Sequence, residues 1–285
     1  MDNMIITFED GSKKEYREGT KFGKIVEDVA PFKEIICGSF NNTILNYDDP
    51  IAKSGKLILY DINTVYGNRT YEKGLTFLFK VCAVEVLGTD YKLRIRHSID
   101  KGIFFEVNKN IEKEQLNQIK KLMKEKVAKA IPFIKIETTM NEALTYYKSI
   151  KREDKAKTLF YDKNNYVTLY RFEDTYNYVI GSLPHNSSVL KYFDLTLIEN
   201  KGIILRFPTM YDNGQVIKYT HHEQFFNSID EYLDWAKVLN ISSIGELNDA
   251  IVSKDPGELI NLSESIQNFR LQQIANQISE KRKDI

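Results

Sequence analysis

Residues 1–62 show a strand pattern of alternating apolar and polar positions on both sides of one helical segment. Four segments have the strand pattern: Met4–Glu9, Lys13–Tyr16, Ile35–Phe40 and Lys56–Tyr60. The turn signal Asp10-Gly11-Ser12 joins the first two segments into a hairpin. Apolar residues at helical spacing predict a helix over Lys21–Val29, with Thr20 as its N-cap. The order ββαββ predicts a ubiquitin-like β-grasp fold.

Residues 63–240 combine longer helical patterns with several strand patterns. Helices are expected at Tyr71–Leu87, Ile111–Ile131, Asn141–Ile150 and His221–Val238. Thr138 or Thr139 is the expected cap of the third helix. Strands are expected at Leu93–His97, Gly102–Val107, Phe133–Glu137, Lys157–Phe160, Tyr166–Phe172 and Tyr178–Ile180, and in the alternating run that ends at Pro208. This mixture of helices and strands predicts the α+β class.

Residues 241–285 change character and become a polar, helical segment. Short helical runs are expected at Ile244–Val252, Leu259–Leu262 and Ile266–Ser279, with an interruption at Asp255-Pro256-Gly257. The chain is therefore predicted to have three parts: a β-grasp domain over 1–62, an α+β domain over 63–240 and a helical connector over 241–285.

Composition narrows the class of protein but does not identify a ligand. Lys+Arg and Asp+Glu are both 40, so only a local patch could favour nucleic acid. The lysines of 111–131 form either a solvated face or a phosphate-facing patch. Cys37 and Cys82 lie in apolar settings, which predicts buried thiols in a reducing compartment. No signal-peptide pattern and no run of 18 apolar residues is present, so we expect a cytoplasmic location and no membrane partner.

The sequence offers few candidates for catalysis. Of four histidines, His185 follows a proline in a loop and is the most site-like, while the adjacent His221 and His222 would diverge by about 100° on a helix. Gly19–Ile25 is one residue too short for a phosphate-binding P-loop, and its last residue cannot bind Mg²⁺. Nucleophile-elbow, H-E-x-x-H and zinc-spacing patterns are absent. We therefore predict no catalytic residue and no metal ligand in this chain.

The first 60 or so residues resemble a TGS domain. The resemblance rests on ITFEDGSKKEYREGTKFGKIVEDV, followed by a small-residue strand and SGKLILYDI. This module occurs at the N-terminus of threonyl-tRNA synthetases, in certain GTPases and in stringent-response enzymes. The resemblance implies a role in binding RNA or a protein partner.

A second resemblance covers residues 63–240 and is to the editing domain, or second additional domain, of threonyl- and alanyl-tRNA synthetases. Its carrying features are K-G-I-F-F-E-V, the following I-E-K-x-x-L-x-x-I-K-K-x-M helix, I-P-F-x-K, N-E-A-L-x-Y-Y and P-H…L-K-Y-F-D-L. In the synthetases this domain removes serine wrongly attached to tRNA. It uses an H-x-x-x-H pair on its first helix and a Cys-x-x-x-His pair in a later loop.

This chain departs from that residue pattern. The two helix histidines of the family fall on Lys73 and Phe77, the loop cysteine falls on Gly181, and the last histidine is His185. Lysine and phenylalanine cannot replace two imidazoles as ligands, and one histidine cannot hold zinc. The usual editing chemistry is therefore not expected.

The combination of a TGS domain with an editing-like domain resembles the N-terminal half of bacterial uridine kinases of the phosphoribulokinase-like family. The tail GELNDAIVSKDPGELINLSESIQNFRLQQIANQIS resembles the helical connector before their kinase domain. The resemblance implies a non-catalytic binding or regulatory region of an ATP-dependent nucleoside kinase. ATP and Mg²⁺ are then expected only in a kinase domain beyond this segment, which is also an expected partner.

The predicted ligand site lies in the editing-like cleft. We single out His185, Lys191 and Arg206 at its rim, and Arg96 and His97 across the sheet, because such cations suit phosphate or carboxylate. The expected ligand is a nucleotide, an amino acid or a tRNA. Two alternatives stay open: an aminoacyl-tRNA deacylase with altered residues, and an RNA-binding or dimerisation module, so a homo-oligomer is also compatible with the sequence.

Overall fold

The computed structural model describes residues 3–221, 243–253 and 255–282, together with the single residues 223, 224, 226, 229 and 241. The fold is α+β, as predicted, and the chain forms two compact units. The first unit comprises Met1–Glu137 and Thr168–Thr220, and the second comprises Thr138–Val167 and His221–Ile285. The helix expected at His221–Val238 lies for the most part outside the described residues.

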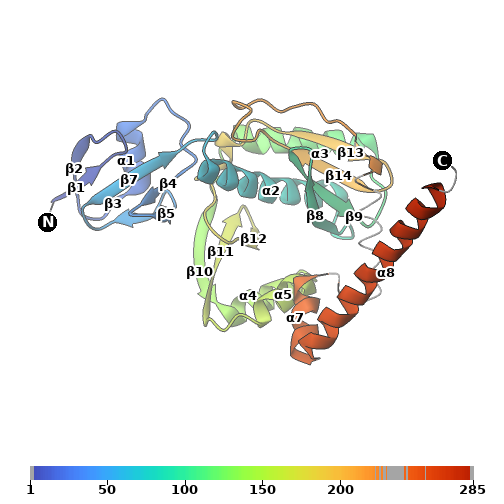
Figure 1. Ribbon diagram of the computed structural model, residues 1–285. Coiled ribbons are helices and arrows are strands. Elements are labelled where there is room, and N and C mark those ends of the chain that lie inside the picture. The colour runs from blue at the N-terminus through green and yellow to red at the C-terminus, as the bar shows by residue number, and fades with distance from the viewer. Residues whose placement is uncertain are drawn as a thin grey trace. The chain divides into compact units, whose positions relative to one another are not determined.

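The first unit begins with a β-grasp module (Figure 1). Its helix is α1, and its strands are β1 (Asn3–Thr7), β2 (Lys13–Arg17), β3 (Thr20–Lys21), β4 (Cys37–Phe40), β5 (Thr43–Leu45), β6 (Pro50–Ile51) and β7 (Gly55–Tyr60). The main sheet has the order β2-β1-β7-β4-β5, and its central strands β1 and β7 are parallel. Apolar side chains of α1 (Phe22–Val29), such as Ile25, are buried against Met4, Ile6 and Leu57 of this sheet.

Thr20 does not cap α1, contrary to the prediction. The residue before the helix is Lys21, which makes no side-chain cap hydrogen bond. Thr20 instead pairs with Ile51 in the short β3–β6 ladder, and its hydroxyl donates to the Arg17 carbonyl at 2.7 Å. Strand pairing with a segment that lies far along the chain decides this position, and local sequence does not report such pairing.

A four-stranded antiparallel sheet and two helices form the larger core of the first unit (Figure 1). The elements are α2 (Val65–Leu87), β8 (Leu93–Ile99), β9 (Gly102–Val107), α3 (Lys113–Ala128), β13 (Asp194–Ile198) and β14 (Gly202–Arg206). The strand order is β13-β14-β9-β8. Buried residues of α2 and α3, such as Phe79 and Ile119, pack with Phe105 of β9 and Leu205 of β14.

Helix α2 begins at Val65, six residues before Tyr71, where apolar spacing predicts its start. Thr64 is its N-cap, and its side chain accepts from the Gly67 N–H at 3.2 Å. Val65 and Tyr66 are exposed, so the first turn carries no apolar periodicity. The cap, rather than the hydrophobic pattern, therefore marks the start of this helix.

A third sheet has the order β10-β11-β12, and the two units divide within its first two strands. Its strands are β10 (Ile134–Thr139), β11 (Tyr166–Phe172) and β12 (Thr175–Tyr178). The strand predicted at Tyr178–Ile180 therefore begins at the residue where β12 ends. The turn between β11 and β12 carries Glu173, which pairs with the buried Lys126 of α3 at 2.5 Å. Lys126 also pairs with Glu85 of α2 at 3.0 Å, which fastens both helices to this hairpin.

The second unit contains helices α4 (Met140–Ser149), α5 (Glu153–Phe160), α7 (Ile244–Ser253) and α8 (Pro256–Arg282). The strand predicted at Lys157–Phe160 is wrong, because this segment is the end of α5. Ala156 and Leu159, three residues apart, are the buried positions of α5, and an acidic first turn favours the helix. The predicted strand has only four residues, Lys157 to Phe160, which are too few to distinguish the two periods.

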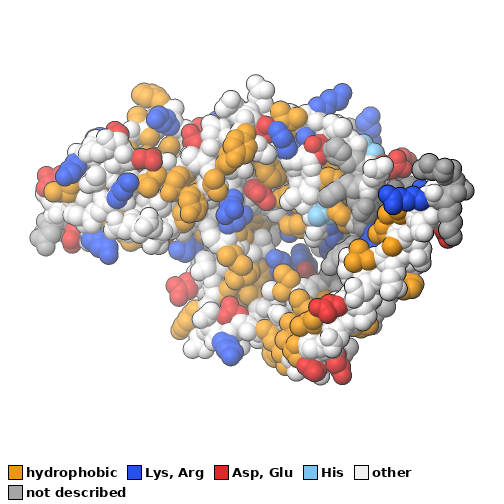
Figure 2. All heavy atoms as spheres, viewed as in Figure 1, with side chains coloured by type: hydrophobic (Ala, Val, Ile, Leu, Met, Phe, Trp, Pro, Cys, Tyr) orange, Lys and Arg blue, Asp and Glu red, His pale blue; other side chains and the backbone are white. Residues whose placement is uncertain are grey.

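The interruption predicted at Asp255-Pro256-Gly257 corresponds to the break between α7, which ends at Ser253, and α8, whose first two residues are Pro256 and Gly257. The two runs expected after it form one helix, α8. Asp255 accepts from the Gly257 N–H at 2.9 Å, and Pro256 occupies the first helical position, where it needs no N–H partner. Exposed apolar side chains lie along α7 and α8 (Figure 2). None of the helices in the described part of the chain has the length and apolar character that a membrane span requires.

Candidate functional site

Helix α2 presents Lys73 and Phe77 one turn apart, at the two positions that the family resemblance makes histidines. Gly74 lies between them and is buried. A Cβ atom added at Gly74 would lie 2.7 Å from Cδ of Pro184. The absence of a side chain at Gly74 therefore lets the loop that carries His185 pack directly on the helix.

The site loop, residues 181–190, is fixed in place by hydrogen bonds to the end of α3 and the start of β10. The Ser187 hydroxyl donates to the Lys126 carbonyl at 2.6 Å and accepts from the Ile131 N–H at 2.9 Å. The Phe133 N–H donates to the His185 carbonyl at 3.0 Å. Asn186 caps the short 3-10 helix η1 (Ser187–Val189) through the Ser188 N–H. The loop is therefore held in one conformation by the core.

Lys73 and Gly181 lie next to each other. A Cβ atom at Gly181 would be 2.7 Å from Nζ of Lys73, and Gly181 has a φ of +95°, which disfavours any other residue. The half-buried Lys73 has no hydrogen bond or ion pair to a described residue. Burial raises the pKa of the nearby Cys37 thiol, and the Lys73 ammonium acts in the opposite direction. An ammonium therefore occupies the region between the helix and the loop.

Phe77 belongs to the aromatic core. Its ring centroid lies 5.9 Å from that of Phe133 and 6.0 Å from that of Phe172, and its side chain is 2% exposed. An aromatic side chain thus fills the space where the resemblance places the second histidine. This packing stabilises the base of the site loop, because Phe133 carries the N–H that binds His185.

His185 is exposed, and its ring stacks on Tyr47 of the β-grasp module. The ring centroids are 4.8 Å apart and the ring planes differ by 22°. Tyr47 is itself held by an edge contact to Phe22 at 5.4 Å and by a hydrogen bond from its hydroxyl to the Ile35 carbonyl at 3.3 Å. Burial raises the pKa of Tyr47 to about 12. The module therefore supplies an aromatic wall to the site loop.

Asn46, next to Tyr47, joins the β-grasp module to the site loop through its side-chain oxygen. The Tyr170 hydroxyl donates to Asn46 Oδ1 at 2.6 Å, and the Ser182 hydroxyl lies 3.0 Å from the same atom. The Tyr170 hydroxyl is also 3.1 Å from the Gly181 carbonyl. Burial raises the pKa of Tyr170 to about 12, so this hydroxyl keeps its proton at neutral pH.

Two ion pairs join the module to the same part of the chain. Lys191, at the end of the site loop, pairs with Glu34, and hydrogen bonding to Glu34 raises the pKa of Lys191. Lys135 of β10 pairs with Asp49 at 3.5 Å. Both lysines remain partly exposed, so their ion pairs contribute little to stability and can open to accept an anion.

The five predicted ligand residues do not converge. His185 and Lys191 lie on or beside the site loop. Arg206 is 1% exposed, pairs with Asp100 at 2.7 Å and donates to the Ile217 carbonyl, so it holds residues 217–220 against β14. Arg96 pairs with Glu106 across the β8–β9 hairpin at 2.5 Å, and His97 packs on Phe104 beyond a bulge in β8. A role of these five residues in binding stays a prediction.

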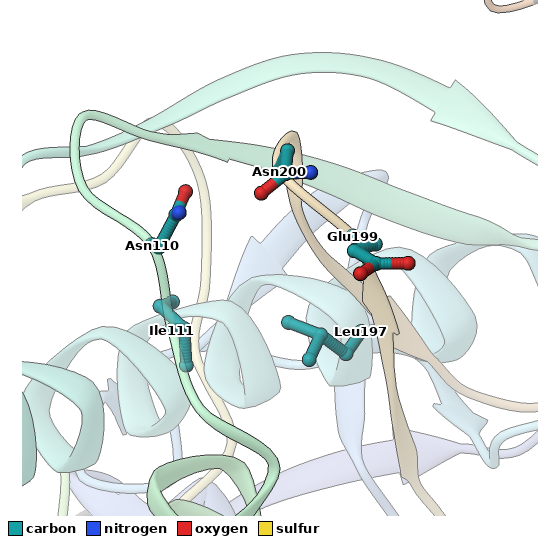
Figure 3. Close-up of a pocket in the computed structure, with 5 residues that line it drawn as sticks. All are labelled: Asn110, Ile111, Leu197, Glu199 and Asn200. Carbon is teal, nitrogen blue, oxygen red and sulfur yellow. The ribbon is translucent and has the colours of Figure 1, made fainter.

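A separate hollow of about 430 Å³ lies between the loop before α3 and the β13–β14 turn. Its lining residues are Asn110, Ile111, Leu197, Glu199 and Asn200 (Figure 3). Ile111 and Leu197 face each other across it, and Glu199 is its ionisable group. None of the five ligand residues predicted from the sequence lines this hollow.

The residues of the site do not fit a metal ion. The positions that the resemblance makes ligands carry Lys73, Phe77 and Gly181, of which none can bind a metal at neutral pH, beside His185. Throughout the described ranges, no cluster of three or more His, Cys, Asp or Glu side chains has the geometry to hold one. The Lys73 ammonium and the His185 imidazole are the ionisable groups at these four positions.

Comparison with known proteins relates this chain to threonine–tRNA ligases. It is 29% identical over 147 residues to the enzyme of Desulforamulus reducens. This match covers 50% of this chain and 23% of the relative. The match to the enzyme of Syntrophotalea carbinolica has 22% identity over 198 residues and covers 68% and 31% of the two chains. For the enzyme of a Geobacillus species, identity is 23% over 240 residues, with 82% and 36% covered. No protein-family model matches the chain.

These matches confirm the coarser part of the predicted resemblance, a threonyl-tRNA synthetase-like region. The chain spans between 23% and 36% of the length of these three relatives. All three are ligases, so the predicted kinase parentage gains no support from them. That part stays a prediction.

Sequence reasoning missed the residues that join the β-grasp module to the site loop: Asn46, Tyr47 and Tyr170. Asn46 and Tyr47 precede the turn Asp48-Asp49-Pro50, where polar and aromatic residues are ordinary. Tyr170 lies 124 positions from Asn46, so its contact depends on how two domains pack. One available signal was Tyr170 itself, which follows the apolar Leu169 in a predicted strand, since buried tyrosine hydroxyls usually have a partner.

Proposed function

We propose that this chain is an editing-type region that binds the aminoacylated 3′ end of a tRNA. The observation that carries the proposal is the packing of the site loop on α2, with Lys73 against Gly181 and Pro184 against Gly74. The threonine–tRNA ligase relatives support tRNA as the ligand class. Balanced overall charge does not oppose it, because the recognition would be local.

The chemistry of the site suits an aminoacyl ester joined to a phosphate backbone. The Lys73 ammonium can donate to an ester carbonyl or a phosphate oxygen. Lys135 and Lys191 lie in weak, partly exposed ion pairs that a phosphate can replace. We therefore expect binding in which Lys73 contacts the acceptor end and the other two lysines contact the backbone.

The test is an equilibrium titration of a full-length tRNA over a series of salt concentrations, with the same tRNA shortened by its last three nucleotides as the control. We expect the full-length tRNA to bind more tightly than the shortened one at every salt concentration. Lys73→Met should abolish that difference, whereas Lys163→Met, at an exposed position of the second unit, should preserve it. Equal affinity for the two tRNAs would contradict the proposal.

A second candidate, deacylation, is favoured by one observation: the half-buried ammonium of Lys73 lies at the loop that carries His185. In this reaction a water oxygen attacks the ester carbonyl, the bond to the ribose oxygen breaks, and that oxygen takes up a proton. Lys73 would stabilise the oxyanion and His185 would accept the water proton. Release of amino acid from mischarged tRNA at a rate above background, lost in Lys73→Met and His185→Phe, would establish this candidate. No release above background would eliminate it.

The nucleoside-kinase parentage is a further proposal, and it rests on the sequence resemblance alone. It concerns a domain beyond this segment and predicts no ATP binding by residues 1–285. The sequence of the gene downstream of the codon for Ile285 tests it. A P-loop motif within about 20 codons would support it, and an open reading frame without one would contradict it.

A further inference from the structure

The Tyr47–His185 pair has the properties of a stacking platform. The two rings are 4.8 Å apart and nearly parallel, with planes 22° from each other. Tyr47 lies against one face of the imidazole, and His185 is nevertheless an exposed residue. Exposed aromatic or imidazole rings of this kind stack the unpaired bases of single-stranded nucleic acid.

The Tyr47 ring and the His185 backbone are held in place before any ligand binds. The Tyr47 ring makes an edge contact with Phe22, and its hydroxyl donates to the Ile35 carbonyl. The Gly23 N–H donates to the Tyr47 carbonyl at 2.8 Å. A Cβ atom at Gly23 would lie 2.6 Å from Tyr47 Cδ1, so the ring lies directly on the backbone of α1. His185 is fixed through its carbonyl by the Phe133 N–H. A preorganised platform loses little conformational entropy when a base stacks on it.

A cation lies close to this platform along the chain. Lys135 follows Phe133 by two residues, and its partner Asp49 follows Tyr47 by two. The Lys135–Asp49 distance is 3.5 Å and the lysine side chain is 45% exposed. A phosphate oxygen can exchange with Asp49 as the partner of Lys135.

We propose that the β-grasp module and the site loop together form a nucleotide-binding platform, in which an unpaired base stacks on the outer face of His185 with Tyr47 behind it. The inference rests on the proposed function in one respect, since it assigns the terminal nucleotide of the bound RNA to this platform. It extends that function by making the β-grasp module part of the site.

The test uses the full chain with ¹³C-labelled histidine, titrated with adenosine 5′-monophosphate and, as a base-free control, with ribose 5-phosphate. We expect the His185 ring signals to move upfield with the nucleotide and to stay within noise with the sugar phosphate. The His185 signals are assigned by their loss in His185→Phe.

Matched variants separate stacking from folding. His185→Phe keeps a planar ring and should bind the nucleotide within about twofold of the original chain, whereas His185→Leu should weaken binding by at least about fivefold. Tyr47→Phe and Tyr47→Leu form a second pair: the phenylalanine variant should bind the nucleotide within about twofold of the original chain, and the leucine variant at least about fivefold more weakly. Circular dichroism verifies that each variant folds. Since His185 is exposed, its pair remains informative even if Tyr47→Leu unfolds.

Failure of this inference is distinguishable from failure of the proposed function. Equal binding of the nucleotide and the sugar phosphate, or equal affinities of His185→Leu and His185→Phe, would overturn the platform. A tRNA that binds through its 3′ end with the same affinity in both variants would overturn the platform and leave the function intact. Stacking of the free nucleotide without any tRNA binding would support the platform as a free-nucleotide site and overturn the function.

Discussion

Glycine at position 74 sets how closely the site loop approaches α2. The Cβ of an alanine there would lie 2.7 Å from Cδ and 2.9 Å from Cγ of Pro184, and a proline ring cannot rotate away. Lys73 and Phe77 lie on the same helix, one residue before and three residues after Gly74. The closeness of helix and loop thus depends on a residue without a side chain.

We expect Gly74→Ala to displace the site loop and destabilise the fold. Overpacking costs about 1–3 kcal/mol, which exceeds the gain of up to about 1 kcal/mol from helix propensity. Gly257→Ala is the control, because its Cβ would lie 3.3 Å from an Asp255 side-chain oxygen, in the first turn of an exposed helix. Urea denaturation measures both variants, and a Gly74→Ala chain at least as stable as Gly257→Ala would contradict the account.

Phe77 and Lys73 also explain why the site could be predicted only in part. The positions themselves follow from the spacing of the family pattern, and the structure places Lys73 against Gly181 and Gly74 against Pro184. The contribution of Tyr47 could not be predicted, because the stack depends on how a separate domain packs against the loop. Short-range periodicity carries no information on such packing.

The start of α4 is an element whose stability follows from its sequence. Thr139 is the N-cap, as one of the two predicted alternatives had it, and it forms a capping box with Glu142. The Glu142 carboxylate accepts from the Thr138 hydroxyl at 2.7 Å, and from the Thr139 hydroxyl and N–H at 2.8 Å and 3.0 Å. The hydrogen bond from Thr138, followed by those from Thr139, lowers the pKa of Glu142 to about 2.

This pKa predicts how α4 responds to acid. Because the folded pKa lies below the ordinary value of 4.5, the contribution of Glu142 is present above about pH 4.5 and is lost as the pH falls towards 2. NMR titration of the Glu142 carboxyl should give a midpoint well below 4.5. Glu142→Gln should be less stable than the original chain at pH 7 and should match it near pH 2. A midpoint at the ordinary value would refute the capping role.

The length of a periodic pattern decides how well an element is predicted. The segments with sustained periodicity, α2 and α3, were found, although their ends shifted by several residues. The four-residue segment Lys157–Phe160 at the end of α5 was assigned to a strand, because four residues fit either period. Packing of α5 with its neighbours in the second unit, including the Lys157–Asp249 pair at 2.7 Å, selects the helix.

At the scale of the first unit, the β-grasp module and the editing-like part behave as one folded body. Their junction contains the Tyr47–His185 stack, the Asn46 hydrogen bonds and a contact between the Thr70 hydroxyl and the Cys37 sulfur at 3.4 Å. Because Thr70, Cys37 and Tyr170 are buried at this junction, separation would expose polar atoms without partners and apolar surface to water.

A double-mutant cycle tests this junction. We expect Tyr170→Phe and Asn46→Ala each to lower the free energy of unfolding by about 1 kcal/mol, and to show a coupling of about 0.5–1 kcal/mol. The coupling should persist at neutral pH and disappear as the pH rises from about 10 towards 12, because burial raises the pKa of Tyr170 to about 12. Additive losses at neutral pH would show that the two side chains do not interact in solution.

The central claim for the whole molecule is that the 3′ end of a tRNA binds at the site loop. Photo-crosslinking measures this directly, with a tRNA that carries 8-azidoadenosine as its terminal nucleotide, followed by mass spectrometry of the protein. We expect crosslinks to peptides that contain residues 43–49 or 178–191. These crosslinks should disappear when an excess of unmodified tRNA is added as a competitor. Crosslinks confined to other segments, or a yield no higher than with the azide at the 5′ end, would contradict it.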